Sequence, residues 1–84
     1  MEEYIKNLMN NYENITENDI QTIKNYIVKL GIELYGIDEY EILSYKDFSE
    51  ISLKYYSRDM NKVSQFILLC SLYRIYNNKL ENDK

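Results

Sequence analysis

Apolar residues recur at helical spacing along most of the chain. In residues 2–12 they lie three and four positions apart, at Ile5, Leu8, Met9 and Tyr12. Side chains at these intervals share one face of a helix. The asparagines that follow weaken helix formation. We therefore expect a first helix that ends near Tyr12 and turns these four side chains toward the core.

A second helix has the clearest start signal in the sequence. Thr16 can cap this helix, and Asp19 stands at the N3 position of a capping box. Ile15 and Ile20 occupy the positions of a hydrophobic staple. An apolar stripe then continues at alternating steps of three and four residues, which is typical of a helix packed against one neighbour. The stripe comprises Ile20, Ile23, Ile27, Leu30 and Leu34.

The end of the second helix has two interpretations. Gly31 can form its C-terminal cap, or the helix can cross Gly31, at a cost of about 1 kcal/mol, and end at Gly36. For residues 31–43 we favour a helix end followed by a loop. The alternative is a short β-hairpin around residues 32–42, which would be marginal without a helix to pack on.

Residues 44–58 repeat the start signal of the second helix. Ser44 can cap a third helix, Asp47 stands at N3, and Leu43 and Phe48 occupy the staple positions. We expect this helix to extend to about the end of the range. Its predicted inner face comprises Phe48, Ile51, Ser52 and Tyr55.

Asp59 can cap a last helix that reaches about Asn77 or Leu80. Almost its whole circumference is apolar, so it should be buried on several sides. It is either the central helix of the bundle or a subunit interface that joins a homodimer through residues 63–76. Its apolar residues are Val63, Phe66, Ile67, Cys70 and Tyr73 on one face, with Leu68, Leu69, Leu72, Ile75 and Tyr76 beside them.

The sequence therefore predicts an all-α fold. We expect one domain, residues 1–84, in which three or four helices form a compact bundle. The longest apolar run has five residues, far below the roughly 20 that a membrane span needs. No positive region leads into an apolar stretch at the N-terminus, so we expect no secretion signal. The single cysteine excludes an internal disulfide and fits a reducing compartment, so we expect a cytoplasmic protein.

The chain lacks the residues that most enzyme mechanisms need. There is no histidine, one cysteine and two glycines. A zinc site is nearly excluded, a Ser-His-Asp or Cys-His arrangement is impossible, and no glycine-rich phosphate loop can form. The acids do not follow calcium-loop spacing. We expect no cofactor, no metal and no catalytic residue, and Cys70 should be a small buried apolar residue.

The composition is biased toward residues with AT-rich codons. Ile, Asn, Tyr and Lys supply 39 of the 84 residues, whereas Ala and Pro are absent. We interpret this bias as the mark of an AT-rich genome, either bacterial or that of a phage or plasmid in such a host. The abundance of Asn and Lys is therefore no sign of function.

Acidic residues are concentrated in the first fifty positions. Residues 1–50 hold eleven acids and four bases, whereas residues 51–80 hold five bases and one acid; the formal net charge of the chain is −4. An acidic, tyrosine-bearing stretch can face a basic groove on another protein, since opposed charge speeds encounter and selects partners. The predicted partner-binding residues are Glu33, Tyr35, Asp38, Glu39, Tyr40, Glu41 and Tyr45.

The ten tyrosines divide into two predicted groups. Those on or beside core faces are Tyr4, Tyr12, Tyr26, Tyr55 and Tyr73, and those expected to be exposed at least in part are Tyr35, Tyr40, Tyr45, Tyr56 and Tyr76. Exposed tyrosine is common in protein interfaces because it brings a large rigid area and a polar tip. The simpler alternative is that the tyrosines fill a small core that has no tryptophan.

Two stretches of the chain resemble the helical core-binding domain of tyrosine recombinases. They are Thr22-Ile23-Lys24-Asn25-Tyr26 and the run from Lys62-Val63 to Leu72-Tyr73-Arg74-Ile75-Tyr76. The resemblance implies a small DNA-binding or regulatory domain. In that alternative the nucleic-acid contacts are Lys54, Arg58, Lys62 and Arg74, although duplex binding usually needs a basic rather than an acidic domain.

In size, charge and coding bias the chain also resembles phage-encoded inhibitors of bacterial defence, including anti-CRISPR proteins. The resemblance carries over no residue, since it rests on no shared motif. It implies a non-enzymatic protein that binds a larger nucleic-acid-handling complex and inhibits it. This is the function that we predict, with the DNA-binding domain and a structural homo-oligomer as alternatives.

Overall fold

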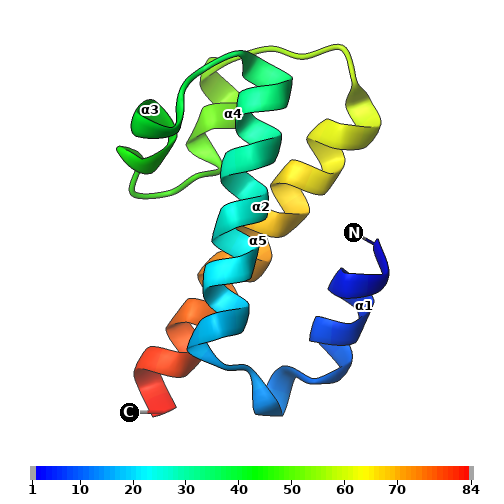
Figure 1. The fold of residues 1–84 in the computed structure, drawn as a ribbon, viewed down its shortest axis with the longest axis vertical. Helices are drawn as coiled ribbons and strands as arrows, with labels where there is room; N and C mark the ends of the chain where they lie inside the picture. The colour runs from blue at the N-terminus through cyan, green and yellow to red at the C-terminus, as the bar shows by residue number, and fades with distance from the viewer. Residues whose placement is uncertain (1, 84) are drawn as a thin grey trace.

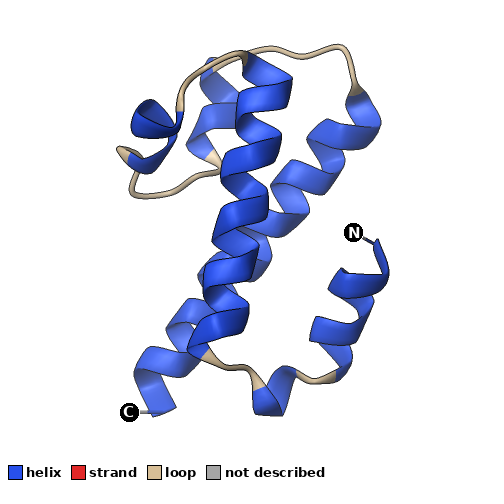
Figure 2. Ribbon diagram, in the orientation of Figure 1, coloured by secondary structure: helices blue, strands red, loops and turns tan. Residues whose placement is uncertain are grey.

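The computed structural model describes residues 2–83, and every regular element within them is helical (Figure 2). The elements are α1 (Glu2–Asn10), a 3-10 turn (Tyr12–Asn14), α2 (Glu17–Tyr35), α3 (Glu39–Leu43), α4 (Glu50–Lys54) and α5 (Met60–Asp83). The all-α fold is confirmed. Residues 2–83 contain no strand, so the hairpin alternative around residues 32–42 is wrong: that stretch ends one helix and forms another.

The two long helices, α2 and α5, cross each other and form the centre of the molecule (Figure 1). Ile23 and Ile27 of α2 and Phe66 and Leu69 of α5 are fully buried. α1 lies beside this pair, and α3 and α4 lie at the end away from the C-terminus (Figure 1). The Cα extents are 35 × 26 × 17 Å. The smallest extent leaves room for about two helix layers, since one helix with side chains is about 10 Å wide.

The predicted start of α2 is confirmed. The Thr16 hydroxyl accepts a hydrogen bond from the Asp19 N–H at 3.2 Å, and the Asp19 carboxylate accepts one from the Thr16 N–H at 3.0 Å. Both staple residues, Ile15 and Ile20, are buried. These contacts satisfy N–H groups that a helix start leaves unpaired.

α2 crosses Gly31 and ends at Gly36. Gly36 has a φ of +67°, which a residue without a Cβ adopts at low cost. Gly31 is buried where α3 approaches α2. A Cβ at Gly31 would lie 2.9 Å from Cδ1 of Ile42, so the glycine makes space for α3.

The predicted third helix is wrong at its start and in its length. Ser44 does not cap a new helix but closes α3, and α4 begins only at Glu50. The Asp47 carboxylate accepts hydrogen bonds from the N–H and the hydroxyl of Ser49, at 3.0 and 2.7 Å. These bonds form an Asx-type turn, so Asp47 shapes a turn where a capping box was predicted.

Three predicted orientations differ from the structure. Met9, in the last turn of α1, and Tyr12, in the 3-10 turn, are exposed rather than turned to the core. Tyr12 leaves the predicted face because α1 already ends at Asn10. Tyr76 is buried rather than exposed, with its ring centroid 5.3 Å from that of Tyr12. The cap of α5 is confirmed, since Asp59 accepts a hydrogen bond from the Lys62 N–H.

Candidate functional site

The α3–α4 segment, residues 36–59, contains most of the predicted partner-binding residues. Asp38 caps α3 by accepting a hydrogen bond from the Glu41 N–H at 2.8 Å. Ile42 of α3 and Ile51 of α4 are fully buried and attach the two short helices to the core. Phe48 is also buried, with its ring centroid 5.3 Å from that of Tyr73 of α5. The backbone of the segment therefore depends on one cap and three buried side chains.

Tyrosines join this segment to the long helices. The ring of Tyr35, at the end of α2, lies 5.5 Å from that of Phe66 and 6.2 Å from that of Tyr55, between centroids. The Tyr55 hydroxyl donates a hydrogen bond to the Glu41 carboxylate, which links α4 to α3. That bond is the main cause that raises the pKa of Tyr55 above its ordinary value. Burial raises the pKa of Tyr35.

The segment carries the most exposed large apolar side chains that the structure describes. Tyr40 of α3 is 88% exposed, Leu53 of α4 is 87% exposed and Tyr56, just after α4, is 80% exposed. Asp38 and Glu39, which precede Tyr40, are also exposed. This combination of carboxylates and solvent-facing aromatic area is suited to contact with another macromolecule rather than to chemistry.

The seven predicted partner-binding residues divide between exposed positions and internal contacts. Asp38, Glu39 and Tyr40 are exposed. Glu33 is also exposed but forms an ion pair with Lys62, which is the main cause that raises the pKa of Lys62. The half-buried residues of the seven are Tyr35, Glu41 and Tyr45. The sequence reasoning missed Leu53, which helical spacing could have identified, since it falls between residues of the predicted inner face.

The four predicted nucleic-acid contacts come from α4, the loop that follows it and α5. Lys54 ends α4, Arg58 lies in the following loop, and Lys62 and Arg74 lie twelve residues apart on α5, or about 18 Å along its axis. Lys62 pairs with Glu33, and the Arg74 guanidinium lies 3.8 Å from the Asp47 carboxylate. Contact with the Tyr45 hydroxyl is the main cause that raises the pKa of Lys54. Two of the four charges are thus partly balanced within the molecule.

Cys70 is buried in the core, as predicted. Burial raises the pKa of its thiol to about 12. The thiol is therefore protonated near neutral pH and is a poor nucleophile.

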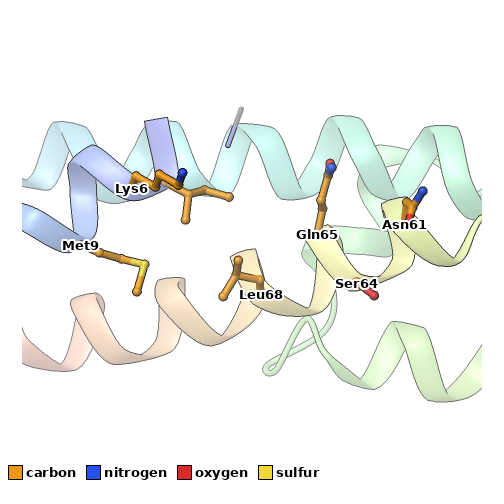
Figure 3. Close-up of a pocket in the computed structure, with 7 residues that line it drawn as sticks. Lys6, Met9, Asn61, Ser64, Gln65 and Leu68 are labelled. Atoms are coloured by element: carbon orange, nitrogen blue, oxygen red, sulfur yellow. The ribbon is translucent and has the colours of Figure 1, made fainter. Parts of the chain in front are cut away.

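A groove of about 690 Å³ lies between α1 and α5. Met9 of α1 and Leu68 of α5 border the same open space, with Lys6 near one end and Asn61 near the other (Figure 3). The remaining lining residues are Ile5, Ser64 and Gln65. Lys6 is the one ionisable group in this lining, so the groove holds no acid–base pair.

No group of three His, Cys, Asp or Glu side chains in residues 2–83 is arranged to hold a metal ion. None of the helices in this range has the length and apolar content needed to cross a membrane. The chain was also compared with protein-family models, curated proteins and solved structures, and none of them matches it.

Proposed function

We propose that this protein is a non-catalytic binding module that docks the α3–α4 segment onto a basic surface of a partner protein. The observation that carries the proposal is Tyr40, whose side chain is 88% exposed beside the exposed acids Asp38 and Glu39. A tyrosine in this setting offers a large rigid contact area and a hydroxyl that can bond to the partner. Leu53 and Tyr56 add exposed apolar area on the same segment.

The charge of the segment favours one class of partner. Grooves that bind nucleic acid are lined by Lys and Arg, which neutralise phosphates. An acidic surface can occupy such a groove and compete with the nucleic acid. We therefore propose that the partner is a nucleic-acid-handling protein in a bacterial cell and that binding inhibits it. The likeness of the chain to anti-defence proteins of phages in size, charge and coding bias supports this choice.

The best test variant changes the exposed residues and keeps the contacts that hold the segment in place. Asp38 caps α3 and Glu41 accepts the Tyr55 hydrogen bond, so both should stay. The double variant Glu39→Lys with Tyr40→Ala removes an exposed acid and the exposed ring. The matched control is Glu81→Lys, an equal charge reversal at an exposed position near the opposite end of the molecule.

In the experiment, the tagged full chain is expressed in a bacterium that has an AT-rich genome, and the proteins bound to it are isolated. We expect wild type and the Glu81→Lys control to retain a nucleic-acid-binding protein, and the double variant to bind it about tenfold or more weakly. In a second step, wild type should displace a labelled oligonucleotide from the purified partner, measured by fluorescence anisotropy. Equal binding by the double variant would refute the role of α3. A partner that keeps its oligonucleotide would refute inhibition by competition.

A further inference from the structure

The side of α5 that faces away from α2 is apolar and exposed. We define the outer face of α5 as Met60, Ser64, Ile67, Leu68, Ser71 and Ile75. Its four apolar members are 62%, 43%, 42% and 48% exposed in chain order. At 100° per residue these six positions fall within a sector of about 100°, opposite the buried Phe66 and Leu69. The helix is therefore apolar on two opposite sides, and α2 covers only one of them.

The outer face has the same pattern when it is read from either end of the helix. Met60, Ser64 and Ile67 give the order apolar, small, apolar, and Ile75, Ser71 and Leu68 repeat that order in reverse. The steps between the six positions are four, three, one, three and four residues. A second α5 laid antiparallel, with its centre between Ile67 and Leu68, would therefore place apolar side chains on apolar ones and serine on serine.

This self-complementarity favours a second copy of this chain as the occupant of the face. A two-fold interface presents the same patch on both subunits, so residue i of one copy meets residue j of the other and the reverse. A patch that matches its own reversed copy meets that condition. An unrelated partner would impose no such symmetry on the six positions.

Electrostatics also permits two copies to meet here, although each chain has a net charge of −4. Residues 63–73 of α5 contain no charged side chain, so the centre of the contact would oppose no like charges. Asp47, in the acid-rich α3–α4 segment, is paired with Arg74 of α5. In the antiparallel arrangement the N-terminus of each α5 lies beside the C-terminus of the other. Opposite ends of the two helix dipoles therefore meet, which is favourable.

The available area suggests a dimer of modest affinity. α5 has 24 residues, or about 36 Å of helix, close to the 35 Å length of the molecule. The groove between α1 and α5 opens beside Leu68, and Met9 on its far wall adds apolar surface. Two paired α5 helices, together with the apolar surface beside the groove, would bury less than about 1,200 Å² in total, which is the low end of specific interfaces.

We propose that two copies of this protein pair through the outer faces of α5, antiparallel, about a two-fold axis between Ile67 and Leu68. Sedimentation equilibrium of the full chain, from about 1 to 500 µM, should show a species of 10.2 kDa giving way to one of twice that mass. Wild type that stays monomeric over this range would overturn the proposal.

A pair of charged variants tests the register. Ile67→Lys and Leu68→Glu should each abolish dimerisation, because each buries an unpaired charge at the axis. Mixed in equal amounts they should form a heterodimer, since position 67 of one copy faces position 68 of the other and lysine then meets glutamate. Ile32→Glu, at an isoleucine of α2 that is 44% exposed, is the matched control and should dimerise like wild type. Single variants that still dimerise, or a mixture that does not, would refute this arrangement.

Cross-linking tests the same register without adding charge at the axis. Met60→Cys mixed with Ile75→Cys should link efficiently through a short bismaleimide at about 100 µM, because these positions face each other. Met60→Cys alone should not link, since its two copies would lie fifteen residues, or about 22 Å, apart along the paired helices. The native Cys70 is buried and should not react under native conditions. Equal linking in the mixture and in the single variant would contradict an antiparallel pair.

Discussion

The α2–α5 pair and the α3–α4 segment are built on different principles. α2 and α5 have 19 and 24 residues, long enough for an apolar stripe to repeat over several turns. α3 and α4 have five residues each, too short to be stable as isolated helices. Their positions depend on the buried side chains Ile42, Phe48 and Ile51 and on the bond between Tyr55 and Glu41. Periodicity therefore determines the pair, whereas a few tertiary contacts determine the segment.

The two regions also differ in how far their side chains are buried. The long pair holds most of the fully buried side chains, and the short segment presents Tyr40, Leu53 and Tyr56 to solvent. A region held by few contacts opens at a lower free energy than the core it rests on. The proposed binding surface is thus the part of the molecule that should adjust most easily to a partner.

The largest expected effects come from truncating one buried side chain in each region. Phe66→Ala in α5 should lower the free energy of unfolding by about 3–5 kcal/mol and weaken amide protection throughout the molecule. Ile51→Ala in α4 should cost about 2–4 kcal/mol, with protection lost mainly in α3 and α4. Hydrogen exchange of both variants, followed by mass spectrometry of peptides, distinguishes the two patterns. Uniform loss of protection in Ile51→Ala would show that the two regions unfold as one unit.

The contrast also explains what could be predicted from the sequence. The start of α2 was correct because the Thr16 capping box and its apolar stripe agree. The start at Ser44 was wrong because a second signal of the same kind lies six residues earlier. Asp38 and Glu41 also have capping-box spacing. The local sequence pattern could not decide between a helix start at Asp38 and one at Ser44. The contact of Ile42 with the surface above Gly31 favours the start at Asp38.

The candidate site, like the fold, could be predicted from the sequence only in part. Tyr40 was expected to be exposed, and it is. The internal contacts of Tyr35 and Glu41 could not be predicted, because both are made with Tyr55, at least fourteen residues away in the chain. Tyr76 was misplaced because its burial depends on Tyr12, from the opposite end of the sequence. Helical spacing identifies a face, but it does not show what covers it.

A smaller effect should appear where the two regions touch. Gly31→Ala places a Cβ 2.9 Å from Cδ1 of Ile42 and 3.4 Å from Cε1 of Phe66. Crowding should cost about 1–3 kcal/mol, offset by about 1 kcal/mol of helix propensity. Ile42→Val removes the crowded Cδ1 and should alone cost about 0.5–1.5 kcal/mol. The double variant should therefore be more stable than the sum of the two single effects implies, by about 1 kcal/mol.

Urea denaturation of the four proteins in this cycle measures that coupling. Gly36→Ala provides the contrast, because Gly36 has a positive φ and open space around it. Its cost of about 1–2 kcal/mol is conformational, so Ile42→Val should not relieve it. If the effects of Gly31→Ala and Ile42→Val simply add, α3 does not pack on α2 as closely as the structure has it.

The smallest effect concerns the turn between the two short helices. Hydrogen bonds from the hydroxyl and then the N–H of Ser49 lower the pKa of Asp47 below its ordinary value of 3.8, with Arg74 adding to them. A depressed carboxyl pKa stabilises the folded state above the unfolded pKa, and this contribution disappears as the pH falls through the folded pKa. Asp47→Asn should therefore lower the free energy of unfolding at about pH 7, and the difference from wild type should shrink below pH 3.8. Because the Asp47 side chain is 40% exposed, we expect only about 0.5 kcal/mol at neutral pH.

The size and pH dependence of this effect test whether local bonds or buried side chains hold the α3–α4 segment. Urea titrations of wild type and Asp47→Asn at several pH values measure it, with Ser49→Ala as the matched background in which the Asp47 effect should be smaller still. A loss above about 2 kcal/mol would mean that the turn, rather than Ile42 and Ile51, places the short helices. A difference that persists unchanged below pH 3.8 would show that the charge of Asp47 plays no part.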